Sequence, residues 1–215
     1  IPTSECLEAN AYIIARYAAI SQEAGLVPIV EPEVLIDGTH TLARSEAVLA
    51  ETLTAVFAAL KKYRIHIPGS ILKTSMALPG KESVVKAGPR EIAEATLRAL
   101  KKSVPQELSG IVFLSGGQSP QEATENLNEI VKIGSTNSTG STSSLRASSG
   151  QAGSPQAGGY PWKITFSYSR ALQETAMDAW AGQDANKIKA QEIFAARVRE
   201  TALASEGKYN EGSSH

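Results

Sequence analysis

Short apolar runs rich in β-branched residues alternate along the chain with longer segments whose apolar residues recur every three or four positions. The short runs predict buried strands at 26–30, 70–72, 110–114 and 163–166. The longer segments predict amphipathic helices at 6–24, 41–63, 89–104, 121–132, 171–181 and 186–206. Strands that alternate with helices indicate βα units around a parallel sheet, so the predicted fold class is α/β.

The length of the chain narrows this class. The first three strand starts lie about forty residues apart, a spacing found in doubly wound sheets and in (β/α)8 barrels. A complete barrel takes about 250 residues and eight strands. Four strands in 215 residues therefore predict either half a barrel or a small parallel sheet with helices on both faces.

Composition removes several classes of protein. The 21 basic and 22 acidic residues leave a net charge of -1, without the basic surface that nucleic acid requires as a partner. No apolar run approaches the roughly 20 residues of a membrane helix, so no membrane partner is expected. Cys6 is the only cysteine, which excludes an internal disulfide and a multi-cysteine metal site. Because the chain starts at Ile1 rather than Met, we expect a processed or truncated product.

Two segments are predicted to remain outside the packed fold. Seventeen of the 26 residues at 134–159 are Gly, Ser or Thr. The segment therefore has too few apolar groups to offset the entropy lost when it becomes ordered. We expect a mobile loop insert there, projecting from the rim opposite the chemistry because it joins a helix to a strand. Residues 207–215 are predicted to form a flexible C-terminal tail.

Charged side chains follow the first two predicted strands. Glu31 and Glu33 are two positions apart, so both point to the same side of the chain at the strand mouth, where paired carboxylates can serve as acid and base. Lys73 ends the second strand, where a low-dielectric pocket lowers the pKa of an amine and frees it to attack a carbonyl. The alternatives are two solvated glutamates and a lysine that extends to solvent.

Two later loops have the composition of a phosphate site. Ser115 and Gly116 follow the third strand, where glycine lets backbone amides approach an anion and the next helix adds its dipole. Ser167, Ser169 and Arg170 follow the fourth strand with hydroxyls, exposed amides and a guanidinium. The alternative for each loop is an ordinary turn.

The histidines and tryptophans are assigned structural roles. His40, His66 and His215 lack the spacing of metal ligands, so no metal site is predicted. Trp162 and Trp180 are predicted to be packing residues rather than parts of a cofactor site.

Several sequence blocks resemble class I fructose-bisphosphate aldolase. They are Gly-Leu-Val-Pro-Ile-Val-Glu-Pro-Glu at 25–33, Phe-Leu-Ser-Gly-Gly-Gln-Ser at 113–119, and Thr-Phe-Ser-Tyr at 165–168 followed by Arg-Ala-Leu-Gln at 170–173. The similarity runs from about residue 2 to residue 209 apart from the insert, and it covers the second half of the family's chain. The resemblance implies the C-terminal half of a (β/α)8 TIM barrel: four parallel strands with helices, plus a C-terminal helix.

The resemblance also implies roles for individual residues. Lys73 would form a Schiff base with fructose 1,6-bisphosphate, Glu31 would handle protons in carbinolamine dehydration, and Glu33 would tune the charge near the lysine. The implied phosphate ligands are Ser115, Gly116, Ser167, Ser169 and Arg170. The implied reaction is a glycolytic and gluconeogenic cleavage to dihydroxyacetone phosphate and glyceraldehyde 3-phosphate. It needs no cofactor and no metal, and the full-length parent would be a cytoplasmic or plastid homotetramer.

Two other interpretations stay open. A half barrel exposes two strand edges and an apolar flank, so the chain could be catalytically incomplete and act as a binding or self-assembly module. Another phosphosugar barrel enzyme, such as an isomerase, would not need Lys73 as a nucleophile.

Overall fold

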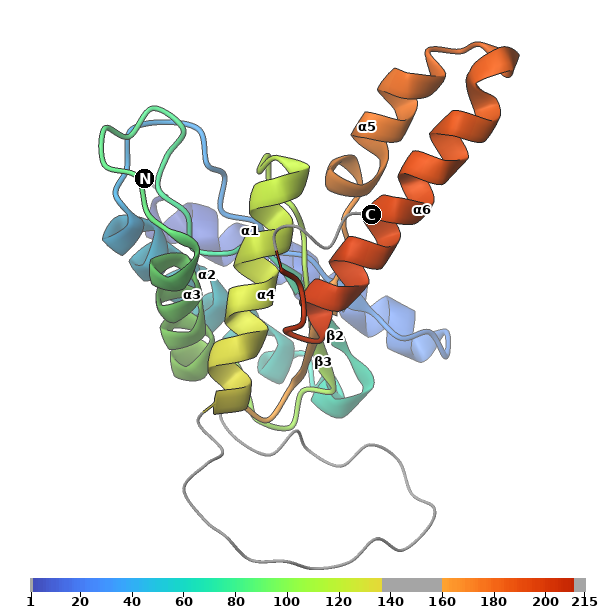
Figure 1. The fold of residues 1–215 in the computed structure, drawn as a ribbon. Coiled ribbons are helices and arrows are strands. Elements are labelled where there is room, and N and C mark those ends of the chain that lie inside the picture. The colour runs from blue at the N-terminus through green and yellow to red at the C-terminus, as the bar shows by residue number, and fades with distance from the viewer. Residues whose placement is uncertain (1, 137–159, 211–215) are drawn as a thin grey trace, which may run out of the picture.

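A computed structural model describes residues 2–136 and 160–210 and contains one sheet with helices packed against it (Figure 1). The strands are β1 (Ile29–Val30), β2 (Ile71–Thr74), β3 (Gly110–Phe113) and β4 (Lys163–Phe166). The helices are α1 (Ser4–Glu23), α2 (Leu42–Lys62), α3 (Pro89–Ser103), α4 (Pro120–Thr136), α5 (Arg170–Trp180) and α6 (Lys187–Ser205), with short 3-10 turns at Ile67–Gly69 and Asp184–Asn186. Every predicted strand and helix is present.

The sheet is parallel, and its strands lie in the order β1-β2-β3-β4. Right-handed crossovers that always step in the same direction place their helices on one face of the sheet. A sheet with helices on both faces would instead reverse its strand order at one point. The observed order is therefore that of part of a (β/α)8 barrel, which decides between the two architectures that the strand spacing allowed.

Burial along the strands follows the same arrangement. Val30, Leu72, Ile111 and Ile164 are buried under the helices, whereas the alternate residues of each strand are more accessible. Because successive strand residues point to opposite faces, one face of the sheet builds the core and the other remains partly open. Lys73 belongs to the second set.

Local sequence sets where the first helices begin. Thr3 Oγ1 accepts a hydrogen bond from the Cys6 amide at 3.2 Å, and Thr41 Oγ1 accepts one from the Arg44 amide at 3.2 Å. Each hydroxyl satisfies an amide that the helix cannot, which contributes about 1 kcal/mol per cap. In α3 the first residue is Pro89, whose fixed φ suits the first helical turn.

The two tryptophans differ in their environment. Trp162 is buried, and its Nε1 donates to the Pro105 carbonyl at 2.7 Å, which confirms its predicted packing role. Trp180 is 37% exposed at the end of α5, so it is less buried than Trp162. Helices α5 and α6 pack side by side and extend away from the sheet (Figure 1), which places the end of α5 far from the core.

The structure moves the boundaries of both segments predicted to lie outside the fold. Helix α4 continues to Thr136, three residues into the predicted insert. A Cβ on Gly134 would lie 1.9 Å from Tyr160 Cε1, so the helix packs closely against the segment that leads into β4. The rest of the insert, 137–159, lies outside the described residues. In the predicted tail, Tyr209 is buried, so this part of the tail is packed, and residues 211–215 lie outside the described residues.

Candidate active site

Strand pairing brings Lys73 and Glu31 together. Val30 is level with Leu72 across the β1–β2 pair, so Glu31, directly after β1, and Lys73, near the end of β2, stand at the same height. Lys73 Nζ lies 2.8 Å from Glu31 Oε1, and their side chains are 22% and 47% exposed. The lysine is therefore held against its neighbouring carboxylate instead of extending to solvent. With one partner half exposed, this ion pair contributes about 0–1 kcal/mol to stability, so its value lies in placing the amine beside a proton carrier.

Glu33 faces the loop after β3. Pro32 is buried between two exposed glutamates, so Glu31 and Glu33 lie on the same side, as the sequence predicts. A Cβ on Gly116 would lie 3.8 Å from Glu33 Oε1. The segment is held from below by Ser75, whose Oγ accepts a hydrogen bond from the Val34 amide at 3.1 Å. The two carboxylates thus face different neighbours, one the lysine and one the glycine-rich loop.

The loop after β3 has a conformation that requires glycine. Gly116 and Gly117 have φ of 57° and 82°, which side-chain-bearing residues rarely adopt. The Ser115 carbonyl accepts from the Gln118 amide at 3.0 Å and from Gln118 Nε2 at 2.9 Å, closing a compact turn. Helix α4 begins two residues later, so its positive N-terminal dipole points toward this loop. Such a loop can hold an anion through backbone amides.

The loop after β4 leaves the sheet beside this one, because β3 and β4 are paired. Ser169 and Arg170 are exposed at the start of α5, where a hydroxyl and a guanidinium can reach an anion. The Ser167 amide donates to the Phe113 carbonyl at 2.8 Å, so this amide belongs to the sheet and corrects the prediction that the backbone of the whole loop is open. Of the two polar donors of Ser167, the exposed hydroxyl is the one that can still bind a ligand.

Between Ser167 and Ser169, Tyr168 turns inward. Its hydroxyl donates to the Ala123 carbonyl of α4 at 2.8 Å. Burial raises the pKa of the Tyr168 phenol, an effect that the nearby Arg197 charge partly offsets, so the group stays a neutral donor at physiological pH. The loop after β4 is therefore fastened to the same helix that follows the loop after β3.

Sequence reasoning missed Lys81. A Cβ on Gly117 would lie 3.3 Å from Lys81 Nζ, so this ammonium group sits over the glycine-rich loop, with Asp37 Oδ1 3.7 Å away. The lysine is brought there because its own loop packs closely on the loop after β1: a Cβ on Gly80 would lie 2.1 Å from the Gly38 carbonyl oxygen. The Pro-Gly-Lys sequence at 79–81 is a turn signal, but turn chemistry does not show which loop the charge approaches.

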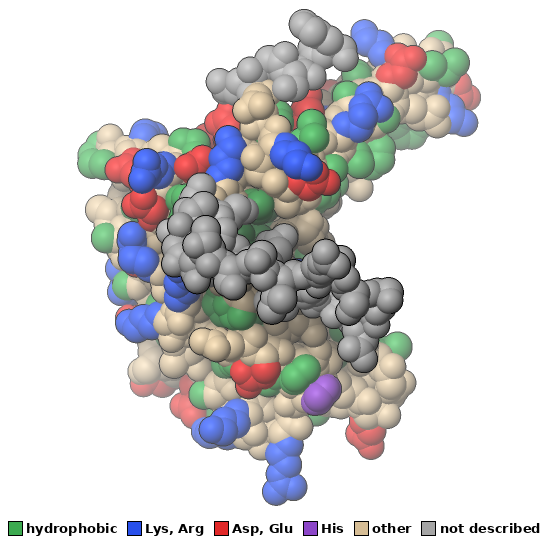
Figure 2. Space-filling model, turned by 60° about the horizontal axis from the view of Figure 1, so that its bottom comes forward, with side chains coloured by type: hydrophobic (Ala, Val, Ile, Leu, Met, Phe, Trp, Pro, Cys, Tyr) green, Lys and Arg blue, Asp and Glu red, His purple; other side chains and the backbone are tan. Residues whose placement is uncertain are grey.

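A cavity lies beside this cluster. Its volume is about 960 Å³, and it is lined by residues of α1, α2 and the loop after β1, among them Glu31 and Glu33. Lys73 does not line it. Side chains of both charges are interspersed over the part of the surface drawn in colour in Figure 2. Within the described ranges, no helix is long and apolar enough to cross a membrane, and no group of three His, Cys, Asp or Glu side chains has the geometry of a metal site.

Parallel strands in sequence order, with a lysine, two carboxylates and a glycine-rich loop at their carboxyl ends, are typical of (β/α)8-barrel enzymes that act on phosphorylated substrates. The family model "Fructose-bisphosphate aldolase class-I" matches residues 1–215, and the chain belongs to this family.

Individual relatives agree with this assignment. Fructose-bisphosphate aldolase B of Sparus aurata is 42% identical over 205 residues, which cover 95% of this chain and 50% of that protein. Cytosolic fructose-bisphosphate aldolase 5 of Arabidopsis thaliana is 43% identical over 213 residues, 99% of this chain and 53% of that one.

A solved structure shows the same fold. Fructose-bisphosphate aldolase from Plasmodium falciparum, determined in complex with TRAP and a small-molecule inhibitor, matches with a TM-score of 0.85 and 37% identity. The match covers 98% of this chain and 54% of that one. The chain spans about half the length of the curated relatives it matches.

Proposed function

We propose that this chain carries the Schiff-base machinery of a fructose-bisphosphate aldolase that cleaves fructose 1,6-bisphosphate into dihydroxyacetone phosphate and glyceraldehyde 3-phosphate. The observation that carries the proposal is the 2.8 Å pair between Lys73 Nζ and Glu31 Oε1 at the strand ends. Membership of the class I aldolase family supports it. A covalent mechanism needs an amine beside a group that exchanges protons, and this pair supplies both.

The proposed reaction begins when the neutral Lys73 amine attacks C2 of the ketose to form a carbinolamine. Glu31 in its acid form protonates the departing hydroxyl, which leaves as water and gives a protonated imine. A base then removes the C4 hydroxyl proton, the C3–C4 bond breaks, glyceraldehyde 3-phosphate departs, and the bond's electron pair moves into the imine to form an enamine. Protonation at C3 and hydrolysis of the imine release dihydroxyacetone phosphate and restore the amine. The lysine-bound imine is the electron sink, so the proposal involves neither metal nor cofactor.

One substrate phosphate is proposed to bind between the loops after β3 and β4. Ser115 and Gly116 would contribute backbone amides beside the α4 N-terminus, Ser167 and Ser169 hydroxyls, and Arg170 a guanidinium. Gly116 and Gly117 keep the first loop close to a ligand because neither has a side chain, and their positive φ supports this role. Glu33, beside Gly116, is proposed to tune the charge between the phosphate and the amine.

Location and assembly belong to the same proposal. We propose a homotetramer and a cytoplasmic location for the whole protein; relatives that are named as cytosolic aldolases support the location. A plastid location is the alternative.

Reductive trapping tests the central step. The protein is incubated with dihydroxyacetone phosphate and sodium borohydride, digested, and mapped by mass spectrometry; we expect one reduced adduct on the peptide that contains Lys73. Lys73→Met is expected to lose the adduct, whereas Lys61→Met, a lysine on the exposed side of α2, keeps it. An adduct that is absent from Lys73, or that persists in Lys73→Met, overturns the proposal.

A second candidate function rests on the outer edge of the sheet. Leu26, Val27 and Ile29 are large, exposed and apolar at the β1 edge, as suits an interaction surface. The chain would then be a binding or self-assembly module without turnover. Size-exclusion chromatography and an aldolase assay of the 215-residue chain separate the two: an active monomer excludes the module, and an inactive oligomer favours it.

A further inference from the structure

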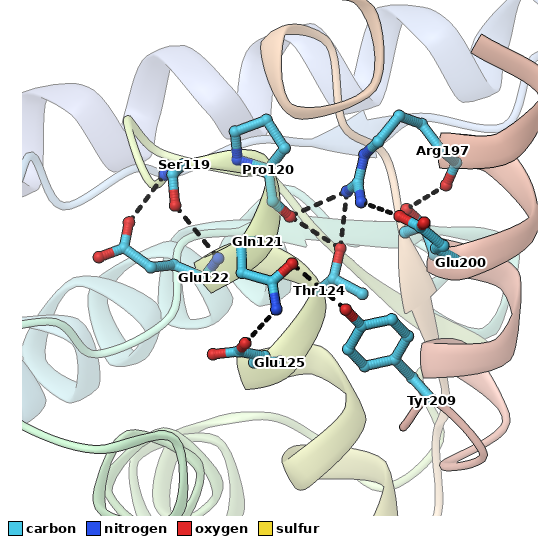
Figure 3. A network of polar contacts seen from close by, with 10 residues as sticks. Ser119, Pro120, Gln121, Glu122, Thr124, Glu125, Arg197, Glu200 and Tyr209 are labelled. Carbon is cyan, nitrogen blue, oxygen red and sulfur yellow. Dashed lines mark hydrogen bonds and ion pairs between the residues drawn. The ribbon is translucent and has the colours of Figure 1, made fainter. Parts of the chain in front are cut away.

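A buried guanidinium on α6 contacts the first turn of α4. Arg197 is 9% exposed, and its Nη2 donates to the Pro120 carbonyl at 2.9 Å and to Thr124 Oγ1 at 2.8 Å (Figure 3). Thr124 Oγ1 donates in turn to the same Pro120 carbonyl at 2.8 Å. On its other side Arg197 pairs with Glu200 of its own helix. One side chain from the end of the chain thus holds the start of a helix more than seventy residues earlier.

That helix start immediately follows the glycine-rich loop. Ser119 caps α4: its amide donates to Glu122 Oε2 at 2.8 Å, and its Oγ accepts from the Glu122 amide at 3.2 Å. Pro120 is the first helical residue, so a shift of its carbonyl also moves Ser119 and the preceding amides. The contact from Arg197 is therefore made at the point that fixes where the loop ends.

The same turns of α4 fasten both candidate phosphate loops. Asn126 Nδ2 donates to Gln118 Oε1 at 2.6 Å, and Gln118 Nε2 donates to the Ser115 carbonyl, which holds the loop after β3. The Tyr168 hydroxyl donates to the Ala123 carbonyl, which holds the loop after β4. Thr124 lies between these two anchors and Pro120 lies one turn before them, so the guanidinium contacts the segment of α4 that serves both loops.

Stability alone does not account for a guanidinium in this place. Arg197 Nε is buried and has no hydrogen-bond partner in the part of the chain that the structure describes. A buried polar atom without a partner is costly, and buried ion pairs replaced by apolar side chains often leave a protein equally stable. An apolar side chain of similar length cannot donate hydrogen bonds, so it cannot hold both the Pro120 carbonyl and Thr124 Oγ1 in place as the guanidinium does.

We propose that Arg197 is a positioning residue for phosphate binding: it sets the first turn of α4 and thereby the amides of the loop after β3 and the place of the loop after β4. The inference rests on the proposed phosphate site. Arg197 is not proposed to touch substrate, because its two Nη atoms are directed to α4 and Glu200 and its Nε is buried.

The test compares Arg197→Met and Arg197→Lys with Arg199→Met, an exposed arginine of the same helix. Amide hydrogen exchange of 115–119 and the dissociation constant of inorganic phosphate are measured on each folded variant. We expect faster exchange and about tenfold weaker phosphate binding in Arg197→Met, which matches the loss of about one hydrogen bond to a charged group. Arg197→Lys keeps the charge beside Glu200 and should recover part of both, whereas Arg199→Met should behave as the parent protein.

The outcomes separate this inference from the proposed function. Unchanged exchange and unchanged phosphate binding in both Arg197 variants overturn the positioning role, even if borohydride trapping on Lys73 succeeds. If the parent protein binds no phosphate, the proposed phosphate site and the positioning role fail together, whatever the trapping result. If Arg197→Met does not fold, Arg197→Lys decides: exchange and phosphate affinity equal to those of the parent overturn the role.

Discussion

Replacing Glu31 by glutamine removes a proton carrier while leaving the shape of the site in place. The pair it forms with Lys73 has a 2.8 Å separation and a carboxylate that is 47% exposed, so its loss should cost about 0–1 kcal/mol of folding stability. General acid–base catalysis by a positioned side chain is worth about 10²–10⁴-fold in rate. Glu31→Gln is therefore expected to lower kcat by that factor in the active aldolase, with little change in KM or in the melting temperature.

Glu46 provides a matched control. Its carboxylate accepts two hydrogen bonds from Arg98, at 2.9 and 2.8 Å, on the helical side of the fold away from Lys73. Glu46→Gln removes an equally well-made ion pair, so it should alter stability to a similar degree and leave kcat unchanged. Steady-state cleavage rates and thermal unfolding are measured for both variants. A kcat for Glu31→Gln within threefold of the parent, or an equal loss of kcat in both variants, would refute the assignment of Glu31 as the proton carrier.

Three further predictions concern packing, charge and pH. Gly134→Ala should destabilise the fold by about 1–3 kcal/mol in urea unfolding, because the new Cβ would lie 1.9 Å from Tyr160 Cε1; an unchanged midpoint contradicts this close packing. Lys81→Met should weaken phosphate binding severalfold and reduce its dependence on salt, since the ammonium sits over Gly117; equal salt dependence in the variant argues against a ligand role. Burial raises the pKa of Tyr160 to about 12, so above about pH 10 the unfolded chain loses this proton while the folded protein keeps it. The free energy of unfolding should therefore fall by up to about 1.4 kcal/mol per pH unit until about pH 12. Tyr160→Phe should reduce this slope and leave the part contributed by the buried Tyr168, and the same slope in both proteins contradicts the burial effect.

The parts of the site that the sequence predicts are those set by strand geometry. Parallel strands end at one edge of a sheet, so residues that directly follow them meet regardless of how far apart they lie in the chain. Glu31 directly follows β1 and Lys73 is the last residue but one of β2, so the positions of two apolar runs place both at the same edge of the sheet. The helices could be placed equally well, because their apolar spacing is a local property.

What the sequence could not predict depends on contacts between distant elements. Arg197 is one of several charged residues on α6, and nothing in its local pattern shows that its guanidinium reaches Pro120. The inward turn of Tyr209 depends on Asn128. Asn128 Nδ2 donates to the Tyr209 carbonyl at 3.1 Å, and Asn128 Oδ1 accepts from the Tyr209 amide at 3.0 Å. The partial exposure of Trp180 has the same origin, because the course of its helix away from the core is not a local property.

Helix α4 serves two structures at once. Its inner face supplies Leu127 and Ile130 to the core, and its first two turns carry the anchors of both candidate phosphate loops. Any small tilt of this helix is transmitted to the loops before the core loses its packing. Mild heating, low denaturant or a weakened α4–α6 contact should consequently reduce the affinity for ligand while the spectroscopic signals of secondary structure stay native.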